Sequence, residues 1–441
     1  MRVYEDMAYG PAPIAECFWR ETVADIPQHG PLEGSARADV AVIGAGYTGL
    51  NAALALAEAG RDVVVLEAEQ PGWGASGRNG GFCCLGGAKA GPDKIRALAG
   101  EDGARDYARA ERAAVDHVAG LLEAHGIEAD THSQGETLLA HRARDVTGLH
   151  EVAERMRHWQ GVESRFIPRE ALAEHGLASP EFHGALTTPI GFGLNPMSYM
   201  LGLARAAVRA GVRLFGASAL IALTHDGDYV LRTERGELRA KQVIFATNGY
   251  SRDDLPGWFA GRYLPVQSNI LVTRPLSDAE LSAQGWTSPQ MCYDTRHLLH
   301  YFRLMPDRRM LFGLRGAMRT TQASHAATRA TARADFERMF PEWRHVETPH
   351  FWSGLLALAR DLMPFAGPVP GMEGAYAAMC YHGNGVAMGS YAGRLLAAQI
   401  TGDGPATPAA MLRPLKRFEL GRFRRLVLPV AYRLYGLQDR G

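Results

Sequence analysis

Residues 39–67 read DVAVIGAGYTGLNAALALAEAGRDVVVLE, and the pattern of this stretch decides the fold. The apolar run 40–43 predicts a short strand, and the leucines and alanines that follow Tyr47 predict an α-helix. The helix is expected to end where Gly60 can adopt the left-handed conformation. Residues 62–66 predict a second strand. The order strand, helix, strand is that of a βαβ unit with two parallel strands.

Three glycines mark the first turn of this unit. Gly44, Gly46 and Gly49 form G-x-G-x-x-G between the predicted strand and the predicted helix. Such glycines allow the tight turn, the approach of the backbone to a pyrophosphate, and close packing of helix on strand. Glu67 ends the second strand, where a carboxylate can accept hydrogen bonds from both ribose hydroxyls and would repel a 2′-phosphate. The pattern predicts an adenosine dinucleotide other than NADP; the alternative is a glycine-rich turn that serves packing alone.

Two further glycine-rich stretches favour FAD over NAD. Residues 71–81, PGWGASGRNGG, follow Glu67 after three residues. Their small side chains would let the chain pass along a pyrophosphate and under a flavin ring, with the Ser76 hydroxyl available to phosphate. Residues 381–389, YHGNGVAMG, open the last predicted core helix. Backbone N–H groups and the positive end of the helix dipole would there stabilise negative charge at the flavin N1–C2=O edge.

The composition bounds the class of protein. The chain has 441 residues, more than one compact core usually holds, so two or three structural units are expected. Hydrophobic residues make up 46% and charged residues 21%, as in packed globular proteins. Lysines plus arginines number 47, and so do aspartates plus glutamates. A net charge of zero provides no overall field that attracts a polyanion, so nucleic acid is not an expected partner.

The cysteines indicate neither a disulfide framework nor a metal site, because their number is odd and no CxxC pair occurs. They are Cys17, Cys83, Cys84, Cys292 and Cys380. The first residues carry charges and prolines where a signal peptide needs an apolar core, and no run reaches the roughly 18 apolar residues of a membrane span. A cytoplasmic protein without stable membrane insertion is expected.

Ordered motifs along residues 36 to 400 resemble the D-amino-acid oxidase type of FAD-dependent oxidoreductase, and within it the gamma-glutamylputrescine oxidase group. These motifs are GYTGLNAALALAEAG (46–60), VVVLEA (63–68), GWGASGRNGG (72–81), YFRL (301–304), MLFG (310–313), WSGLLALARDLMPFAG (352–367) and GNGVAMGSYAGRLLA (383–397). Several motifs in the same order are far more specific than any one of them.

The resemblance implies an α/β fold: a Rossmann-like FAD-binding domain of the glutathione-reductase type with an interleaved α+β substrate domain built on a large antiparallel-rich sheet. The expected domains are residues 36–90, 190–265 and 354–405 for FAD, residues 91–189 and 266–353 for the substrate, and a C-terminal helical extension, 406–441.

The resemblance also places a set of residues around FAD. These residues are Gly44, Ala45, Gly46, Tyr47, Thr48, Glu67, Ala68, Gly74, Ala75, Ser76, Arg78, Asn79, Gly80, Gly81, Phe82, Ala219, Leu220, Thr247, Asn248, Gly249, Gly354, Gly383, Asn384, Gly385, Val386 and Ala387. The gamma-glutamylputrescine oxidase group has His where this chain has Asn384, a difference next to the active site that bears on the choice of substrate.

Four residues are candidates for the catalytic site. Tyr301 and Arg303 share one face of a predicted strand that is expected to cross above the flavin, although Tyr301 could be a sheet aromatic and Arg303 a surface charge. His382 could polarise a substrate amine or be a structural histidine. Trp352 could form an apolar or cation-binding wall, although such a tryptophan is more often part of the core.

The resemblance implies an enzyme that takes a hydride from the carbon beside the nitrogen of a primary or secondary amine, a gamma-glutamylputrescine-like amine or an N-substituted amino acid. The imine would hydrolyse, and O2 would reoxidise the flavin to give H2O2. Two alternatives stay open. One is a flavin amine dehydrogenase that passes electrons to a carrier, and the other is a flavin-binding protein without turnover.

Noncovalent FAD is expected. Covalent relatives attach the flavin through a Cys or a His, and the matching residues 358–361, LARD, include neither. Cys83 and Cys84 lie off the position expected for such a linkage. Purified protein should therefore release its flavin on acid precipitation.

Relatives of the sarcosine oxidase kind use a lysine above the flavin to activate O2. No lysine occurs between Lys241 and Lys416, the span that would include the strands over the ring. His382 or Arg303 is therefore expected to supply the positive charge, unless electrons pass to a carrier.

The C-terminal run 412–440 mixes basic and apolar residues. Docking on a membrane surface is one interpretation. A solvated helix face that covers the nucleotide-binding unit is favoured, because the chain has no net charge.

Overall fold

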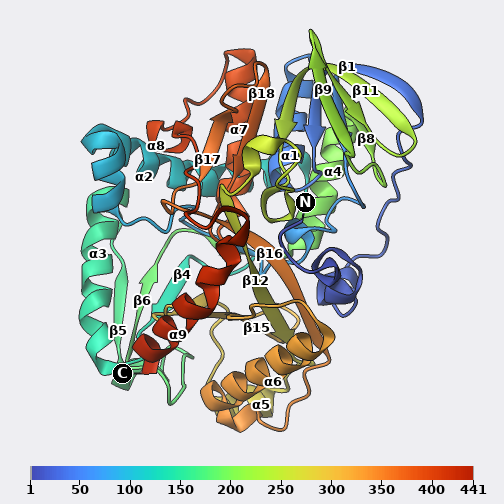
Figure 1. Cartoon of the computed structure of the whole chain (residues 1–441). Helices are drawn as coiled ribbons and strands as arrows, with labels where there is room; N and C mark the ends of the chain where they lie inside the picture. Colours follow the sequence, from blue (N-terminus) through green and yellow to red (C-terminus); the bar gives the residue numbers. More distant parts are fainter. Residues whose placement is uncertain (1, 441) are drawn as a thin grey trace.

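The computed structural model describes residues 2–440, which form two large sheets (Figure 1). The first sheet has the order β17-β18-β11-β1-β2-β8. Its central pairs are parallel, β17 joins antiparallel to β18, and β9 and β10 extend the sheet from β11 as an antiparallel ribbon. The strands are β1 (Gly34–Ile43), β2 (Val63–Leu66), β8 (Arg213–Phe215), β9 (Ala222–Asp226), β10 (Asp228–Arg232), β11 (Gly236–Phe245), β17 (Phe365–Pro368) and β18 (Ala375–Met379).

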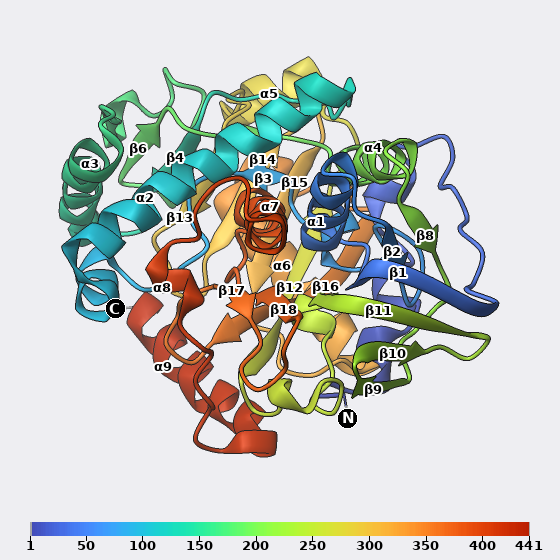
Figure 2. The ribbon, with the colours of Figure 1, turned by 90° about the horizontal axis from the view of Figure 1, so that it is seen from above.

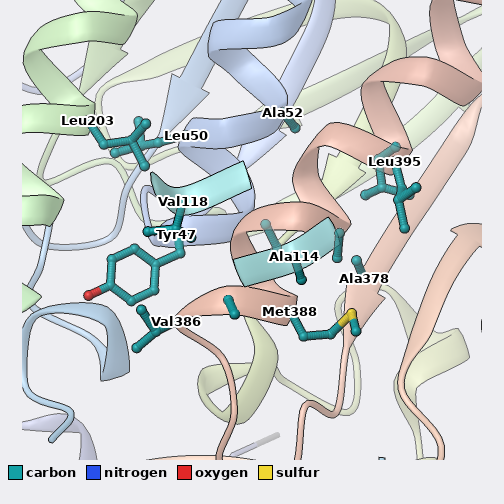
Figure 3. Close-up of a cluster of buried hydrophobic side chains, with 14 of the residues drawn as sticks. Tyr47, Leu50, Ala52, Ala114, Val118, Leu203, Ala378, Val386, Met388 and Leu395 are labelled. Carbon is teal, nitrogen blue, oxygen red and sulfur yellow. The ribbon is translucent and has the colours of Figure 1, made fainter. Parts of the chain in front are cut away.

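Both faces of the first sheet are buried. Val40 and Val42 point to a layer of four helices, while Ala41 and Ile43 point to the opposite core beneath the β9-β10 ribbon. The helices are α1 (Tyr47–Glu58), α2 (Pro92–His125), α4 (Pro196–Arg209) and α7 (Ala387–Thr401). Figure 2 shows α1 and α7 next to each other above the sheet. Side chains of all four helices meet in one apolar cluster that includes Leu50, Val118, Leu203 and Met388 (Figure 3).

The second sheet has the order β16-β12-β15-β14-β13-β4-β6-β5. All its pairs are antiparallel except β13-β4. The strands are β4 (Glu136–Leu139), β5 (Arg165–Pro168), β6 (Gly184–Thr188), β12 (Tyr263–Val272), β13 (Met291–Asp294), β14 (His300–Leu304), β15 (Met310–Arg315) and β16 (His350–Ala359). The large antiparallel-rich sheet predicted for the substrate unit is confirmed.

Alternation along the second sheet separates a core face from a cavity face. Phe302 and Phe312 pack with Phe336 and Trp343 beneath α5 (Asp278–Gln284) and α6 (Gln322–Met339). Tyr301, which precedes Phe302 on β14, points the other way and lines a cavity on the opposite face. The remaining elements are α3 (Val146–Gln160), which packs on β6, the short pair β3 (Phe82–Cys83) and β7 (Phe192–Gly193), and the C-terminal helices α8 (Ala409–Leu412) and α9 (Val427–Arg440).

Local sequence signals account for several helix ends. Helix α1 begins at Tyr47, and Gly60 behind it has a φ of +77°. The Asn195 side chain caps α4 by accepting from two backbone N–H groups, and Ser277 forms a capping box with Glu280. Such caps satisfy backbone donors that the helix itself leaves free.

The residue type of Asp93 predicts an N-cap at that position, and the structure shows that this prediction is wrong. Helix α2 begins one residue earlier, at Pro92, and Gly91 is its N-cap. Proline suits the first helical position, because its fixed φ is helical and the N–H group that it lacks would have no partner there.

The division into domains stays a prediction. The expected limits 36, 265 and 354 fall inside β1, β12 and β16. Helix α2, expected in the substrate unit, contributes Ala114 and Val118 to the core above the first sheet. This packing favours counting α2 with the nucleotide-binding unit.

Candidate active site

A cavity of about 530 Å³ is lined by elements of both sheets. The turn after β1, the end of β2, the loop 72–80 and the turn before α7 line it from the first sheet, and Tyr293, Tyr301 and Arg315 line it from the second. All residues that were expected around FAD line this cavity except Gly81, Gly249 and Ala387. The structure therefore brings the separate motifs into one site.

The three glycines of the first turn have the steric roles that the motif predicts. Gly44 has a φ of +102°, and a Cβ there would lie 3.0 Å from the carbonyl oxygen of Ala246. A Cβ on Gly46 would lie 2.8 Å from Ser76 Oγ. A Cβ on Gly49 would collide with the carbonyl oxygen of Gly44. A side chain at any of these positions would close the cradle or push helix α1 from β1.

Glu67 stands at the end of β2 with both carboxylate oxygens in use. Oε2 accepts from the backbone N–H of Ala45 at 2.7 Å, and Oε1 accepts from that of Glu69 at 3.0 Å. Burial raises the pKa of Glu67, while these backbone donors act in the opposite direction. Each oxygen retains further accepting capacity toward the cavity, as binding of a ribose requires.

The loop after β2 is fixed from several sides. Ser76 Oγ accepts from the backbone N–H of Tyr47 at 3.0 Å, which ties the loop to the start of α1. Arg78 is buried, donates to the carbonyl oxygens of Trp73 and Ser353, and stacks on the Trp73 ring. Asn79 Oδ1 accepts from Gly81 N–H at 2.8 Å. Arg78 and Asn79 therefore shape the cradle through its backbone.

Among the four catalytic candidates, Tyr301 lines the cavity. Its hydroxyl lies 2.8 Å from Ser268 Oγ, and its ring packs edge-on against Phe82. A Cβ on Gly80 would lie 2.8 Å from the Tyr301 ring, and Gly313 on the neighbouring strand leaves space for the same ring. The two glycines thus define where Tyr301 sits over the loop.

Arg303, Trp352 and His382 do not line the cavity. Arg303 Nε donates to Gly80 O at 2.9 Å, and its guanidinium also contacts Leu194 O and His132 behind the loop. Trp352 Nε1 donates to Arg78 O at 2.8 Å. These two side chains are fully buried supports of the loop. For Arg303, a position on the expected strand face was not sufficient to place it at the cavity.

His382 faces away from the cavity although its neighbours line it. Nδ1 donates to Gly87 O at 2.7 Å, which leaves Nε2 to accept from the backbone N–H of Ala359 at 3.1 Å. Burial lowers the pKa of His382 to about 4. The ring is neutral near pH 7, so the expectation that it supplies a positive charge is not supported.

Charged residues that the sequence did not single out line the cavity instead. Lys89 is exposed to the cavity, and desolvation there lowers its pKa to about 8, with Arg315 acting in the same direction. Arg315 donates to His382 O at 3.0 Å, and its Nε has no partner among residues 2–440. Lys89 is one of only four lysines in the chain, and it precedes the span between Lys241 and Lys416 in which a lysine above the flavin was expected to be absent.

Glu136 on β4 is the carboxylate of this wall. Tyr293 Oη donates to Glu136 Oε1 at 3.4 Å. Burial raises the pKa of Glu136 to about 7, while Cys84, Tyr293 and Lys89 act to lower it. No motif indicated this residue, because it reaches the cavity through the pairing of β4 with β13.

A second cavity, of about 200 Å³, adjoins the first. The two share Leu85, Gly86, Glu136 and Tyr293 in their walls. Glu111 on α2 lines the second cavity and, within the described part of the chain, has no hydrogen bond or ion pair. Burial and the nearby Glu136 raise the pKa of Glu111 to about 8. The site therefore extends past Glu136 into a chamber with an unpaired acidic group.

The residues present fit FAD. The glycine cradle would be filled by any Cβ, Glu67 offers acceptors at the ribose position, and Gly385 and Val386 present the start of α7 to the same cavity. The model of the family described as FAD dependent oxidoreductase matches residues 39–399. The chain belongs to this family. It is an enzyme, and FAD is its cofactor.

Curated relatives match over most of their length. The probable oxidoreductase OrdL of Haemophilus influenzae is 32% identical, over 85% of this chain and 86% of that protein. The gamma-glutamylputrescine oxidoreductase of Escherichia coli is 31% identical, over 93% and 94%. Glycine oxidase from Geobacillus kaustophilus has a TM-score of 0.71 at 19% identity, over 87% of this chain and all of that chain, which confirms the fold.

No helix among residues 2–440 is both long and apolar enough to cross a membrane. No group of three or more His, Cys, Asp or Glu residues in the same described range could hold a metal ion.

Proposed function

We propose that the protein oxidises the C–N bond of a primary or secondary amine to an imine, with O2 as the electron acceptor. The observation that carries this proposal is Glu136, a carboxylate in the wall of the cavity that holds the FAD cradle. Tyr293 donates one long hydrogen bond to this desolvated carboxylate, which can still accept from a substrate ammonium group. Gamma-glutamylputrescine oxidoreductase and glycine oxidase, to which the chain is similar, carry amines in their names, which supports the same class of substrate.

Glu136 has a second role in this proposal. A hydride leaves the carbon readily only when the neighbouring nitrogen is uncharged and can donate its lone pair. A carboxyl group with a pKa near 7 can take the proton from a bound ammonium at neutral pH. Bound FAD supplies the hydride acceptor.

The reaction balances without a further reagent. The amine loses two electrons and two protons as a C–H and an N–H bond break and a C=N bond forms. O2 takes up both electrons and both protons and becomes H2O2. Water then cleaves the imine to a carbonyl product and ammonia or an amine. Lys89 provides a positive charge inside the cavity, which favours electron transfer to O2 because oxygen becomes an anion.

The shape of the site favours an extended amine. The chamber beyond Glu136 is lined by Leu138, Val152 and Met156 and ends at the unpaired Glu111. An aliphatic chain fits the apolar wall, and a second cationic group would partner Glu111. Gamma-glutamyl amines and polyamines are therefore proposed ahead of N-methyl amino acids and aminophosphonates.

A substrate screen with peroxide detection tests the proposal. Extended amines should give H2O2 in the same amount as imine hydrolysis product. Glu136→Gln should lower kcat/KM by about a hundredfold, while the exposed matched control Glu128→Gln should not change it. Product without peroxide would favour a dehydrogenase that uses a carrier. Equal loss in both variants would remove Glu136 from the mechanism.

A further inference from the structure

An apolar stripe runs along the outer surface of the C-terminal segment. The C-terminal stripe is defined here as six residues whose relative exposures range from 37% to 66%: Leu420, Phe423, Val427, Val430, Leu434 and Leu437. Val427, Val430, Leu434 and Leu437 lie on α9, where spacings of three and four residues place side chains on one face, while Leu420 and Phe423 belong to the 3-10 turn before it. Leu426, beside the stripe, is 64% exposed. Large aliphatic side chains rarely gather in such a row on a free surface.

The other face of α9 is anchored to the protein. Leu428 is buried against Leu264 and Val266, and Tyr432 packs at the same contact. Successive residues of an α-helix are 100° apart, so positions 428 and 432 point away from Val430 and Leu434. The helix therefore already has a core face, and the C-terminal stripe is a second apolar face.

Further contacts fix the two ends of this segment. Arg424 is fully buried and forms an ion pair with Asp253 at 2.7 Å. Asp439 accepts from His297 Nδ1 and from the backbone N–H groups of His297 and Leu298. Helix α9 crosses the front of the molecule in Figure 1 and lies at the lower left edge in Figure 2, which is turned by 90°. The stripe is thus held in a defined position on the surface.

Positive charge is concentrated around the stripe. Residues 412–440 contain seven arginines and one lysine against Glu419 and Asp439, in a chain with no net charge. Both acids have partners, because Glu419 pairs with Arg360 and Asp439 pairs with His297. Four exposed cations of the segment have no hydrogen bond or ion pair within residues 2–440; they are Lys416, Arg417, Arg422 and Arg433.

We propose that the C-terminal stripe docks the protein on an anionic lipid surface. An amphipathic segment with aliphatic residues on one face and arginines beside them binds at the boundary between headgroups and acyl chains. These four cations, of which Arg422 stacks on the Phe423 ring, would meet lipid phosphates, as in other basic segments next to membranes. This docking is peripheral and goes beyond the proposed function, on which it does not depend.

Charge argues against a second copy of the chain as the occupant. In a two-fold symmetric dimer the same surface patch of each copy faces the other. Two segments rich in unpaired arginines would then face each other, and like charges across an interface oppose association. Anionic lipid supplies the complementary charge and the apolar phase together.

Vesicle co-sedimentation of the full-length FAD-loaded protein tests this proposal. The protein should pellet with vesicles of phosphatidylcholine and phosphatidylglycerol, remain in the supernatant with phosphatidylcholine alone, and be released by high salt. The double variant Val430→Asn with Leu434→Gln should bind at least about fivefold less. The variant Arg422→Gln with Arg433→Gln should lose the preference for anionic vesicles. The control Ile221→Gln, at another exposed aliphatic residue, should bind as the parent does.

Flavin absorbance and the thermal midpoint verify that each variant is folded. Parent protein that stays in the supernatant with phosphatidylglycerol vesicles overturns the proposal. The same holds if Ile221→Gln lowers binding as much as the double variant. A third outcome is that the parent binds no vesicles but forms a dimer, which the double variant Val430→Asn with Leu434→Gln dissociates. This result would identify the stripe as an interface between copies and would equally overturn lipid docking.

Discussion

Replacing Glu67 by Gln should weaken FAD binding by a predictable amount. Both carboxylate oxygens of Glu67 already accept from backbone N–H groups, Ala45 at 2.7 Å and Glu69 at 3.0 Å. A Gln side chain has one acceptor oxygen and one NH2 group. The NH2 group would face one of these backbone N–H donors and could not accept its hydrogen bond. The variant therefore loses an acceptor toward the ribose and disturbs the turn that holds the acceptor in place.

The magnitude follows from one lost hydrogen bond to a charged group, about 1.5 to 3 kcal/mol. Because 1.4 kcal/mol corresponds to a factor of ten, the Kd for FAD should rise by about ten- to a hundredfold. The assay is a titration of deflavinated protein with FAD, followed by flavin fluorescence. Glu69→Gln is the matched control, since it removes the same charge two residues away, and it should change the Kd by less than about threefold. A Kd for Glu67→Gln within twofold of the parent would refute the placement of the ribose.

Three further predictions concern the same cavity. Lys89→Met should slow reoxidation of the reduced flavin by O2 by about tenfold, while the control Lys94→Met should reoxidise at the parental rate. Lys89 faces Arg315, Glu136 and Cys84 and has a pKa of about 8, so the parental rate should fall as pH rises through 8. A parental rate in Lys89→Met would contradict this assignment. Acid precipitation should leave the flavin in the supernatant, because burial raises the pKa of the Cys84 thiol and keeps the thiol protonated. If the pellet of the parent protein retained flavin and the pellet of Cys84→Ser did not, the flavin would be covalently linked. Gly80→Ala should raise the Kd for FAD by at least about fivefold, because its Cβ would lie 2.8 Å from the Tyr301 ring. The control Gly91→Ala, with open space around it, should leave the Kd unchanged. Equal Kd values for the two variants would mean that the Tyr301 ring moves freely.

The cofactor site could be predicted because its residues act through local geometry. The glycines at 44, 46 and 49 are required by contacts within one turn, and Glu67 ends a strand whose partner strand carries that turn. Each of these relations spans a short stretch of sequence. The motif therefore contains the information that places the residues.

The polar wall of the cavity could not be predicted in the same way. Glu136 and Tyr293 meet because β4 pairs with β13, and no local pattern encodes that pairing. Arg303 lies on the expected strand and the expected face, yet it bonds to the carbonyl of Gly80 and ends behind the loop. Whether a side chain reaches a cavity or supports its wall depends on the neighbouring strands and loops, which the sequence of one strand does not specify.

Anaerobic mixing of the FAD-loaded protein with a series of extended amines, followed by absorbance of the flavin, tests whether the protein oxidises amines. At least one gamma-glutamyl amine or polyamine should bleach the flavin fully, about a hundredfold more slowly in Glu136→Gln and at an unchanged rate in Glu128→Gln. A flavin that stays oxidised with every amine at saturating concentration, in a protein that binds FAD normally, would contradict the proposed amine oxidation.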